Sequence, residues 1–341
     1  MVARARRVAQ RGRVTEAERR SLRTLVARQV RGAVADTTGA VADTTADVPR
    51  EVGPVLAAAV RRHLLGPLAH RAGWPGFRGD HAASAIQSDR RAEILAEAVG
   101  VLHMAGIPVL LLKGVAYAGT LYAEAALRPM SDIDLMVSAT SYGTAITVLG
   151  RLGYWHAGTP DQLSAPNHGF SLKRKDGSLD IHRHITHAGR TSIDLTALWR
   201  DARPTALPGA VRASAPHEYL IHITHMARHE LAVPAINVVD AALLRAAAHG
   251  GSTCDLDGLA DRWRIGRGHR AVVRLLDELS LGHSRNDSRI LPALDEILDG
   301  RRPGRLLQIA RKVALTDDLR GVAALVSATV RGRLEHLRSR A

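Results

Sequence analysis

The stretch LLLKGVAYAGTLYAEAALRPMSDIDLMV, residues 110–137, decides the fold that we expect for this chain. An apolar run over residues 109–112 predicts a buried strand, which Lys113 and Gly114 end. An alanine-rich segment compatible with a helix follows, and then an Arg-Pro-Met-Ser turn. Residues 132–137 first alternate between acidic and apolar side chains and then become apolar, which predicts a second strand entering a core.

The second predicted strand carries two carboxylates. Successive side chains of a strand point to opposite faces, so Asp132 and Asp134 share one face. Two neighbouring carboxylates repel each other unless a cation lies between them, and oxygen ligands suit Mg²⁺. The spacing alone is weak evidence, because Asp255 and Asp257 repeat it in a segment typical of a helix start or loop. Asp132 and Asp134, by contrast, follow a predicted strand, turn and helix and lie on a second strand. This order of elements favours a metal site over a solvated strand end.

The order of these motifs resembles the DNA polymerase β-like nucleotidyltransferase superfamily. More narrowly, K-G, then L-Y, then R-P-M-S-D-I-D-L resembles a family of largely uncharacterised bacterial nucleotidyltransferases, over about residues 94–276. The superfamily usually has Gly-Ser or Gly-Gly where this chain has Gly114-Val115, and a shorter interval from this glycine to Asp132. Both departures are usual in the narrower family. The resemblance implies an α+β fold, with a small mixed sheet flanked by helices and an all-helical C-terminal domain.

A hairpin further along the chain is the second informative region. Asp176-Gly177 separates two strand-like arms, and Asp180 and His182 share a face of the second arm. Enzymes of this superfamily place a third carboxylate on a strand next to the Asp pair. The resemblance therefore implies that Asp180 is the third metal ligand, and His182 also fits the pattern of the narrower family.

The implied activity is the Mg²⁺-dependent transfer of a nucleoside monophosphate from an NTP, with ATP expected, to an acceptor. Two Mg²⁺ ions would be held by the catalytic carboxylates, which are Asp132, Asp134 and Asp180. The residues expected to bind the nucleotide are Lys113, Gly114, Arg128, Ser131 and His182. A small molecule, a peptide or protein side chain, a sugar and an RNA end all stay open as acceptors, and so does the oligomeric state.

Composition sets further bounds. Lys and Arg number 47 against 33 acidic residues, which gives a net charge of +14. Residues 1–31 contain ten Arg and two Glu, so we expect residues 1–50 to form a basic, disordered arm and linker. This arm could make weak contact with nucleic acid, although a solvated and partly helical extension is the simpler interpretation. Cys254 is the single cysteine, no apolar run is long enough for a membrane span, and no signal peptide is evident, so we expect a cytoplasmic protein.

We expect a nucleotidyltransferase-like domain with N-terminal helices over residues 51–210 and a helical domain over residues 211–341. Two alternatives to the enzyme above stay open. One is a nucleotide-binding regulatory protein that keeps the fold without turnover. The other is a metal-dependent hydrolase, because spacings of three and four place three histidines on one helical stripe, with an aspartate on the following helix: His222, His225, His229 and Asp240.

Overall fold

The computed structural model describes residues 14–38, 48–156, 168–186, 189–250, 254–281, 290–292, 294–300, 303–317 and 322–323. Within these residues the fold is α+β, as the sequence predicts, with a six-stranded mixed sheet in the order β3-β4-β2-β1-β6-β5. The strands are β1 (Val109–Leu112), β2 (Ile133–Met136), β3 (Gly169–Arg174), β4 (Gly177–His182), β5 (Arg203–Pro204) and β6 (Ala210–Arg212). The sheet therefore brings the two informative regions of the sequence together, since β2 and β4 are neighbours.

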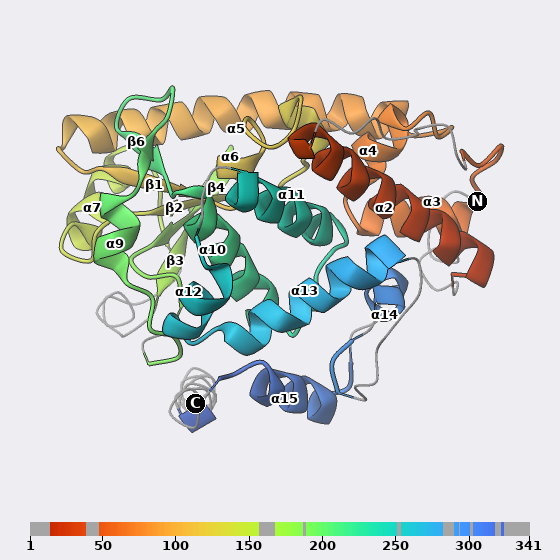
Figure 1. Cartoon of the computed structure of the whole chain (residues 1–341). Helices are drawn as coiled ribbons and strands as arrows, with labels where there is room; N and C mark the ends of the chain where they lie inside the picture. Colours follow the sequence, from red (N-terminus) through yellow and green to blue (C-terminus); the bar gives the residue numbers. More distant parts are fainter. Residues whose placement is uncertain are drawn as a thin grey trace, which may run out of the picture.

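Helices surround this sheet (Figure 1). Before and within the sheet region they are α2 (Glu16–Thr38), α3 (Pro54–Arg62), α4 (Gly66–Arg71), α5 (Arg78–Met104), α6 (Gly114–Tyr117), the short 3₁₀ helix η1 (Ala125–Leu127), α7 (Tyr142–Arg151) and α9 (Leu195–Arg200). After the sheet they are α10 (Ala215–Arg228), α11 (Ile236–Gly250), α12 (Leu256–Arg262), α13 (Gly266–Leu281), α14 (Leu294–Asp299) and α15 (Arg305–Ala314). None of the helices in this part of the chain combines the length and apolar character that a membrane span requires.

The strand register explains why the carboxylates meet. Strands β2 and β4 are parallel, and Asp134 is the register partner of Asp180. Strand β1 runs antiparallel to β2 on its other side, with Leu112 opposite Asp134. The predicted hairpin is present as the antiparallel pair β3–β4. Because side chains of paired residues lie on the same face of a sheet, Asp134 and Asp180 point to one face together.

The opposite face of these strands is part of the core. Ile133, Leu135, Leu179 and Ile181 alternate with the polar residues of β2 and β4, and all four are buried. Each fully buried aliphatic side chain stabilises the fold by about 1.5–3 kcal/mol relative to an exposed one. A shift of either strand by one residue would turn these side chains to solvent, so the core fixes the register that aligns the carboxylates.

The prediction of a disordered arm over residues 1–50 is wrong for the part of the arm that the structure describes. Residues 16–38 form helix α2, which lies beside α11 and α14 (Figure 1). Leu22, Leu25 and Val26 of this helix are fully buried. These apolar residues recur at helical spacing, so they form a stripe that packs on the helical part of the molecule. The rest of the arm, residues 1–13 and 39–47, lies outside the described residues.

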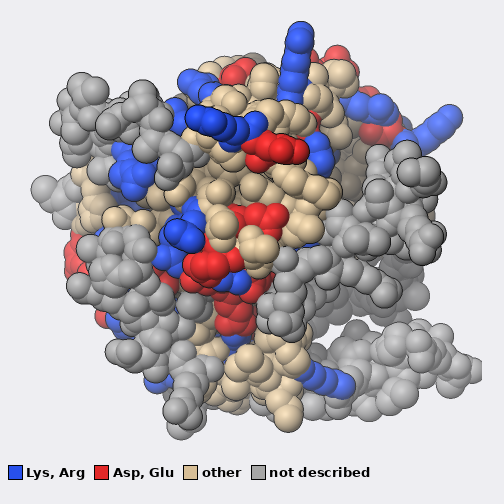
Figure 2. All heavy atoms as spheres, turned by 90° about the vertical axis from the view of Figure 1, so that its right-hand side faces the viewer, with Lys and Arg blue, Asp and Glu red and all other residues tan. Residues whose placement is uncertain are grey.

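The arginines of α2 are also engaged within the molecule. Arg19 forms an ion pair with Asp299 at 3.0 Å, and Arg23 forms one with Asp295 at 2.5 Å. Figure 2 shows this side of the molecule, where acidic and basic atoms lie next to each other. Neighbouring opposite charges reduce the field that these two arginines would offer to a nucleic acid.

The predicted boundary at residue 210 falls inside strand β6. This strand pairs in parallel with β1, with Ala210 opposite Val109 and Arg212 opposite Leu111. It therefore belongs to the sheet, and the helical part of the described chain begins with α10 at Ala215. The short strand was missed because its three residues carry no recognisable period.

Candidate active site

The centre of the site is Asp134 on β2. Its side chain is only 2% exposed, and it accepts hydrogen bonds from the Lys113 ammonium and from Nε2 of His182, the latter at 2.9 Å. Burial by itself would raise the pKa of this carboxyl, but the His182 hydrogen bond and the Lys113 charge outweigh it and hold the pKa below its usual value. The structure thus keeps a buried carboxylate ionised by surrounding it with hydrogen-bond donors, one of which is the Lys113 ammonium.

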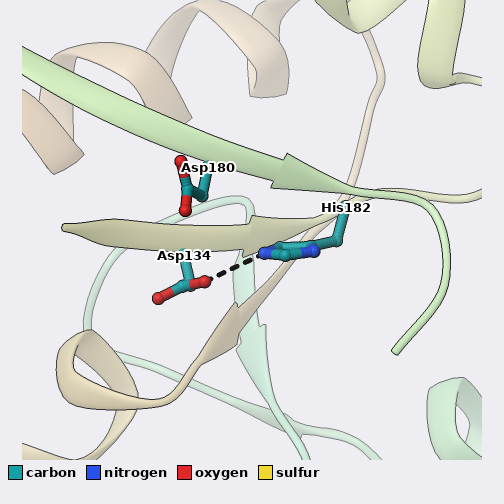
Figure 3. A group of neighbouring side chains, drawn as sticks. All are labelled: Asp134, Asp180 and His182. Atoms are coloured by element: carbon teal, nitrogen blue, oxygen red, sulfur yellow. Dashed lines mark hydrogen bonds and ion pairs between the residues drawn. The ribbon is translucent and has the colours of Figure 1, made fainter. Parts of the chain in front are cut away.

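Asp180 and His182 complete a compact group with Asp134 (Figure 3). Each of the three residues offers one ligand atom, and these atoms lie within 4.8 Å of one another. Asp180 also accepts a hydrogen bond from the Ser171 hydroxyl at 2.5 Å, across the β3–β4 pair. The three possible metal ligands therefore lie on strands β2 and β4, whose backbone hydrogen bonds hold them in position more firmly than a loop would.

This donor set suits a divalent cation. Carboxylates bind both Mg²⁺ and Mn²⁺. The imidazole suits Mn²⁺, the softer of the two ions, better than Mg²⁺. Lys113 compensates the charge of Asp134 in this structure, and a bound metal ion would supply compensation in the same way. Asp134, Asp180 and His182 are thus the residues of this site that could hold a metal.

Asp132 lies at the edge of this group. It precedes β2, is half-buried, and accepts a hydrogen bond from the Ser131 hydroxyl at 3.1 Å. Burial, together with the charge of Asp134, raises its pKa. Among the described residues, the group with ligand atoms within 4.8 Å contains His182 in the place where the sequence predicted Asp132. The alternation along β4 already predicted that Asp180 and His182 share a face, but His182 was expected to bind the nucleotide and not the metal.

The Lys113-Gly114 turn lies beside these carboxylates. Lys113 has a φ of 52°, in the left-handed region that is rare for residues other than glycine. Such a conformation costs about 1–3 kcal/mol and is often found at functional sites. It directs the ammonium to Asp134 at the start of α6. A side chain at Gly114 would bring its Cβ to 3.1 Å from Cβ of Met130, so Met130 would have to shift by a few tenths of an ångström.

Arg128 is held by a buried ion pair beside the Gly114 turn, where a Cβ on Gly114 would lie 3.8 Å from its Nη1. Its guanidinium is buried and pairs with Asp240 of α11, with Nη2 and Nε at 2.7 and 2.9 Å from one carboxylate oxygen. Nη1 donates to the carbonyl of Pro129 at 2.5 Å. Tyr122 donates its hydroxyl to the same Asp240 carboxylate at 2.6 Å. Arg128 thus links the turn before β2 to the helical part of the chain, and its contact with a phosphate stays a prediction.

The histidines of α10 do not form the metal centre of the hydrolase alternative. Nε2 of His222 is hydrogen-bonded to the Asn237 carbonyl at 2.9 Å, and the Asp240 carboxylate is taken up by Arg128 and Tyr122. Within the described part of the chain, these histidines and Asp240 do not bring ligand atoms together as a metal group. Burial, aided by nearby positive charges, lowers the pKa of His229 to about 4, so its imidazole is neutral.

Two histidines of the stripe nevertheless border the site. The charge of Lys113 contributes to the lowered pKa of both His222 and His225, after burial as the main cause. The ring of His225 lies between those of His222 and His229, at centroid distances of 6.4 and 4.7 Å. The lowered pKa values keep His222 and His225 neutral, next to a site whose charge is carried by Lys113 and the carboxylates.

Three comparisons with known proteins bear on the identity of the chain. The solved structure described as antibiotic-resistance factor ANT(2'')-Ia is similar to this chain with a TM-score of 0.36 and 14% identity, over 57% of this chain and 100% of that chain. No curated protein matches the chain. The family described as uncharacterised nucleotidyltransferase matches residues 49–280, which is more than half of the 341 residues. The chain therefore belongs to this nucleotidyltransferase family.

Proposed function

We propose that this nucleotidyltransferase moves a nucleoside monophosphate from an NTP, with ATP as the expected donor, to an acceptor hydroxyl, using Mg²⁺. The observation that carries the proposal is the register pair Asp134–Asp180 on adjacent parallel strands, with His182 beside it and the Lys113-Gly114 turn next to it. Divalent cations, when bound, neutralise phosphate charge and orient the attacking and leaving oxygens. The protein's own contribution is to hold its charged groups in place before the substrates arrive.

Each residue has a separate task in the reaction. A bond forms between the acceptor oxygen and the α-phosphorus, the bond from that phosphorus to the bridging oxygen breaks, and pyrophosphate leaves. Lys113 places a positive charge beside the leaving pyrophosphate, and the close turn at Gly114 lets the backbone approach the phosphates. Asp180, on the far side of β2 from β1, accepts the proton of the attacking hydroxyl.

The roles of Asp180 and Asp134 can be tested with matched variants. Asp180→Ala is expected to lower pyrophosphate release by at least about 100-fold, the lower range for general acid–base catalysis, while ATP affinity changes less than about threefold. The control is Asp201→Asn, because Asp201 is outside the proposed site and pairs with Arg200 at the surface. Asp134→Asn is expected to abolish turnover and to weaken Mn²⁺ binding, which electron paramagnetic resonance measures without any assay of activity.

The measurement uses ATP labelled at the α-phosphate, Mg²⁺ and a cell extract as the source of acceptor. Turnover of Asp180→Ala at the wild-type rate would remove Asp180 from the reaction. ATP binding without pyrophosphate release in the wild-type protein would favour the regulatory alternative instead. Bound ATP with unchanged Mn²⁺ affinity in Asp134→Asn would contradict the assignment of the metal ligands.

A further inference from the structure

A basic pocket lies between α5 and the tip of the β3–β4 hairpin. It has a volume of about 430 Å³, within the range of sites for small molecules. The hairpin contacts α5 here, since Arg174 pairs with Glu97 at 2.7 Å. The charged residues that line the pocket are Arg90, Arg91, Lys173, Arg174, Lys175 and Asp176. Two of the four lysines of the entire chain, Lys173 and Lys175, are thus in one pocket.

The charge of this pocket is only partly compensated by the protein. Arg174 is neutralised by Asp176 at 2.6 Å and by Glu97. Within the described residues, Arg91 and Lys173 have no carboxylate within 4.0 Å, whereas Arg19, Arg23, Arg61, Arg128 and Arg311 each have one. Arg90 also lines a neighbouring hollow together with Asp89 and Glu93, and these two carboxylates partly offset the charge of Arg90.

Arg91 carries its charge in a half-buried position. Nη1 donates to Oε1 of Gln87 at 3.2 Å, which is a neutral partner. Burial lowers the pKa of this guanidinium, and the charge of Asp132 opposes that effect. A half-buried cation without a close carboxylate is less stable than a paired one, so an anion in the pocket would compensate it.

The pocket borders the candidate active site without including its carboxylates. Ser131 lines it, and the hydroxyl of this residue donates to Asp132. Lys173 is the register partner of Ser178, two residues before Asp180, so its side chain is on the same face as that carboxylate. The pocket therefore meets the site from the β4 side, whereas Lys113 approaches from the end of β1.

These two sides have different chemical roles. An in-line displacement places the attacking and leaving oxygens on opposite sides of the phosphorus. If the pyrophosphate leaves beside Lys113, the acceptor must enter from the side of β4. The basic pocket is on that side, so its charge acts on the acceptor rather than on the triphosphate.

We propose that the pocket binds a phosphate group of the acceptor through Arg91 and Lys173, which makes the acceptor a small phosphorylated molecule. Arg offers a fork of donors to phosphate oxygens, and Lys adds a mobile point charge. A polycationic acceptor would be repelled by the same residues. This inference rests on the proposed nucleotidyl transfer only for the direction of attack, and phosphate binding can be measured without turnover.

The first experiment titrates inorganic phosphate into the full chain by calorimetry, with the nucleotide site saturated by Mg²⁺ and α,β-methylene-ATP, which cannot transfer. We expect the wild type to bind one phosphate, and the double variant Arg91→Glu/Lys173→Glu to bind it at least about tenfold more weakly, because two charge-assisted contacts are lost. The control is Arg78→Glu/Arg305→Glu, two exposed arginines outside the pocket with the same change in charge. Equal affinity in both double variants, or no binding by the wild type, would overturn the proposal.

The second experiment identifies the charge of the acceptor. An extract is treated with alkaline phosphatase, the phosphatase is removed by ultrafiltration, and the filtrate is incubated with protein, Mg²⁺ and ATP labelled at the α-phosphate. We expect the treatment to remove the labelled product that an untreated filtrate gives. A product that survives the treatment and binds a cation exchanger would refute a phosphorylated acceptor. No product from any filtrate would count against the transfer itself, while the phosphate titration decides on the pocket independently.

Discussion

Replacing Asp240 by asparagine tests the buried ion pair that Asp240 forms with Arg128 beside the site. The Asp240 side chain is 0% exposed, and it receives the Tyr122 hydroxyl at 2.6 Å and two nitrogens of Arg128 at 2.7 and 2.9 Å. Burial acts to lower the pKa of Arg128, but the Asp240 carboxylate raises it above its usual value. The guanidinium therefore stays charged after the substitution and loses the anion that compensates it.

The expected cost follows from this uncompensated charge. Removing one partner of a buried ion pair typically destabilises a protein by about 3–5 kcal/mol. This is a large share of the roughly 5–15 kcal/mol that separates folded from unfolded states in ordinary domains. Tyr122→Phe removes a single hydrogen bond to the carboxylate and should cost about 1.5–3 kcal/mol. Arg128→Met/Asp240→Leu removes both charges together and should be closer to the wild type than Asp240→Asn is.

Guanidinium chloride unfolding, followed by circular dichroism and tryptophan fluorescence, measures these free energies. The control is Asp201→Asn, because Asp201 pairs with Arg200 at the exposed surface, and we expect no measurable change there. The double variant separates a charge effect from a packing effect, since it keeps side-chain volume while removing both charges. A free energy of unfolding for Asp240→Asn within about 1 kcal/mol of the wild type would refute the reasoning.

Two further predictions concern stability away from the site. Deletion of residues 1–47 should lower the free energy of unfolding by several kcal/mol, because Leu22, Leu25 and Val26 each lose a burial of about 1.5–3 kcal/mol. Thermal unfolding compares it with deletion of residues 1–13, which keeps α2, and equal stability of the two would disprove a structural role for this helix. His63 should make the protein less stable in acid. Its Nδ1 accepts a hydrogen bond from the Ala235 amide at 3.2 Å, so its Nε2 carries the proton and donates to the Leu298 carbonyl at 2.8 Å. A second proton on the ring would occupy Nδ1 and break the hydrogen bond from Ala235. Burial lowers its pKa below the value of about 6.5 in the unfolded chain, so the unfolded state binds more protons and stability falls as the pH drops below about 6.5. His63→Gln should flatten this fall in urea unfolding series, and an unchanged slope would exclude the effect.

Strands β1 to β4 could be predicted because their signals are local. The apolar run of β1, the alternation in β2 and the Asp-Gly turn of the β3–β4 hairpin each lie within a few residues. The position of Asp180 beside Asp134 needed the resemblance as well, since no local pattern says which strands pair. Helix α2 was misread for a related reason. The many arginines of this segment hide an apolar stripe that has meaning only when α11 is present to cover it.

Arg128 illustrates why residue type and motif position do not determine a role. In sequence it stands four residues before Asp132, in an Arg-Pro-Met-Ser turn, which is where a phosphate ligand would be useful. Its partner Asp240 is 112 residues away, and nothing near either residue predicts the pair. Folding places both in a buried environment, where each charge is tolerated only because of the other. The pair then holds the turn that leads into β2 against α11, so the geometry of the carboxylates depends on a contact made by the helical part of the chain. The site is therefore assembled from both parts of the molecule, although the residues proposed for the chemistry lie on the sheet.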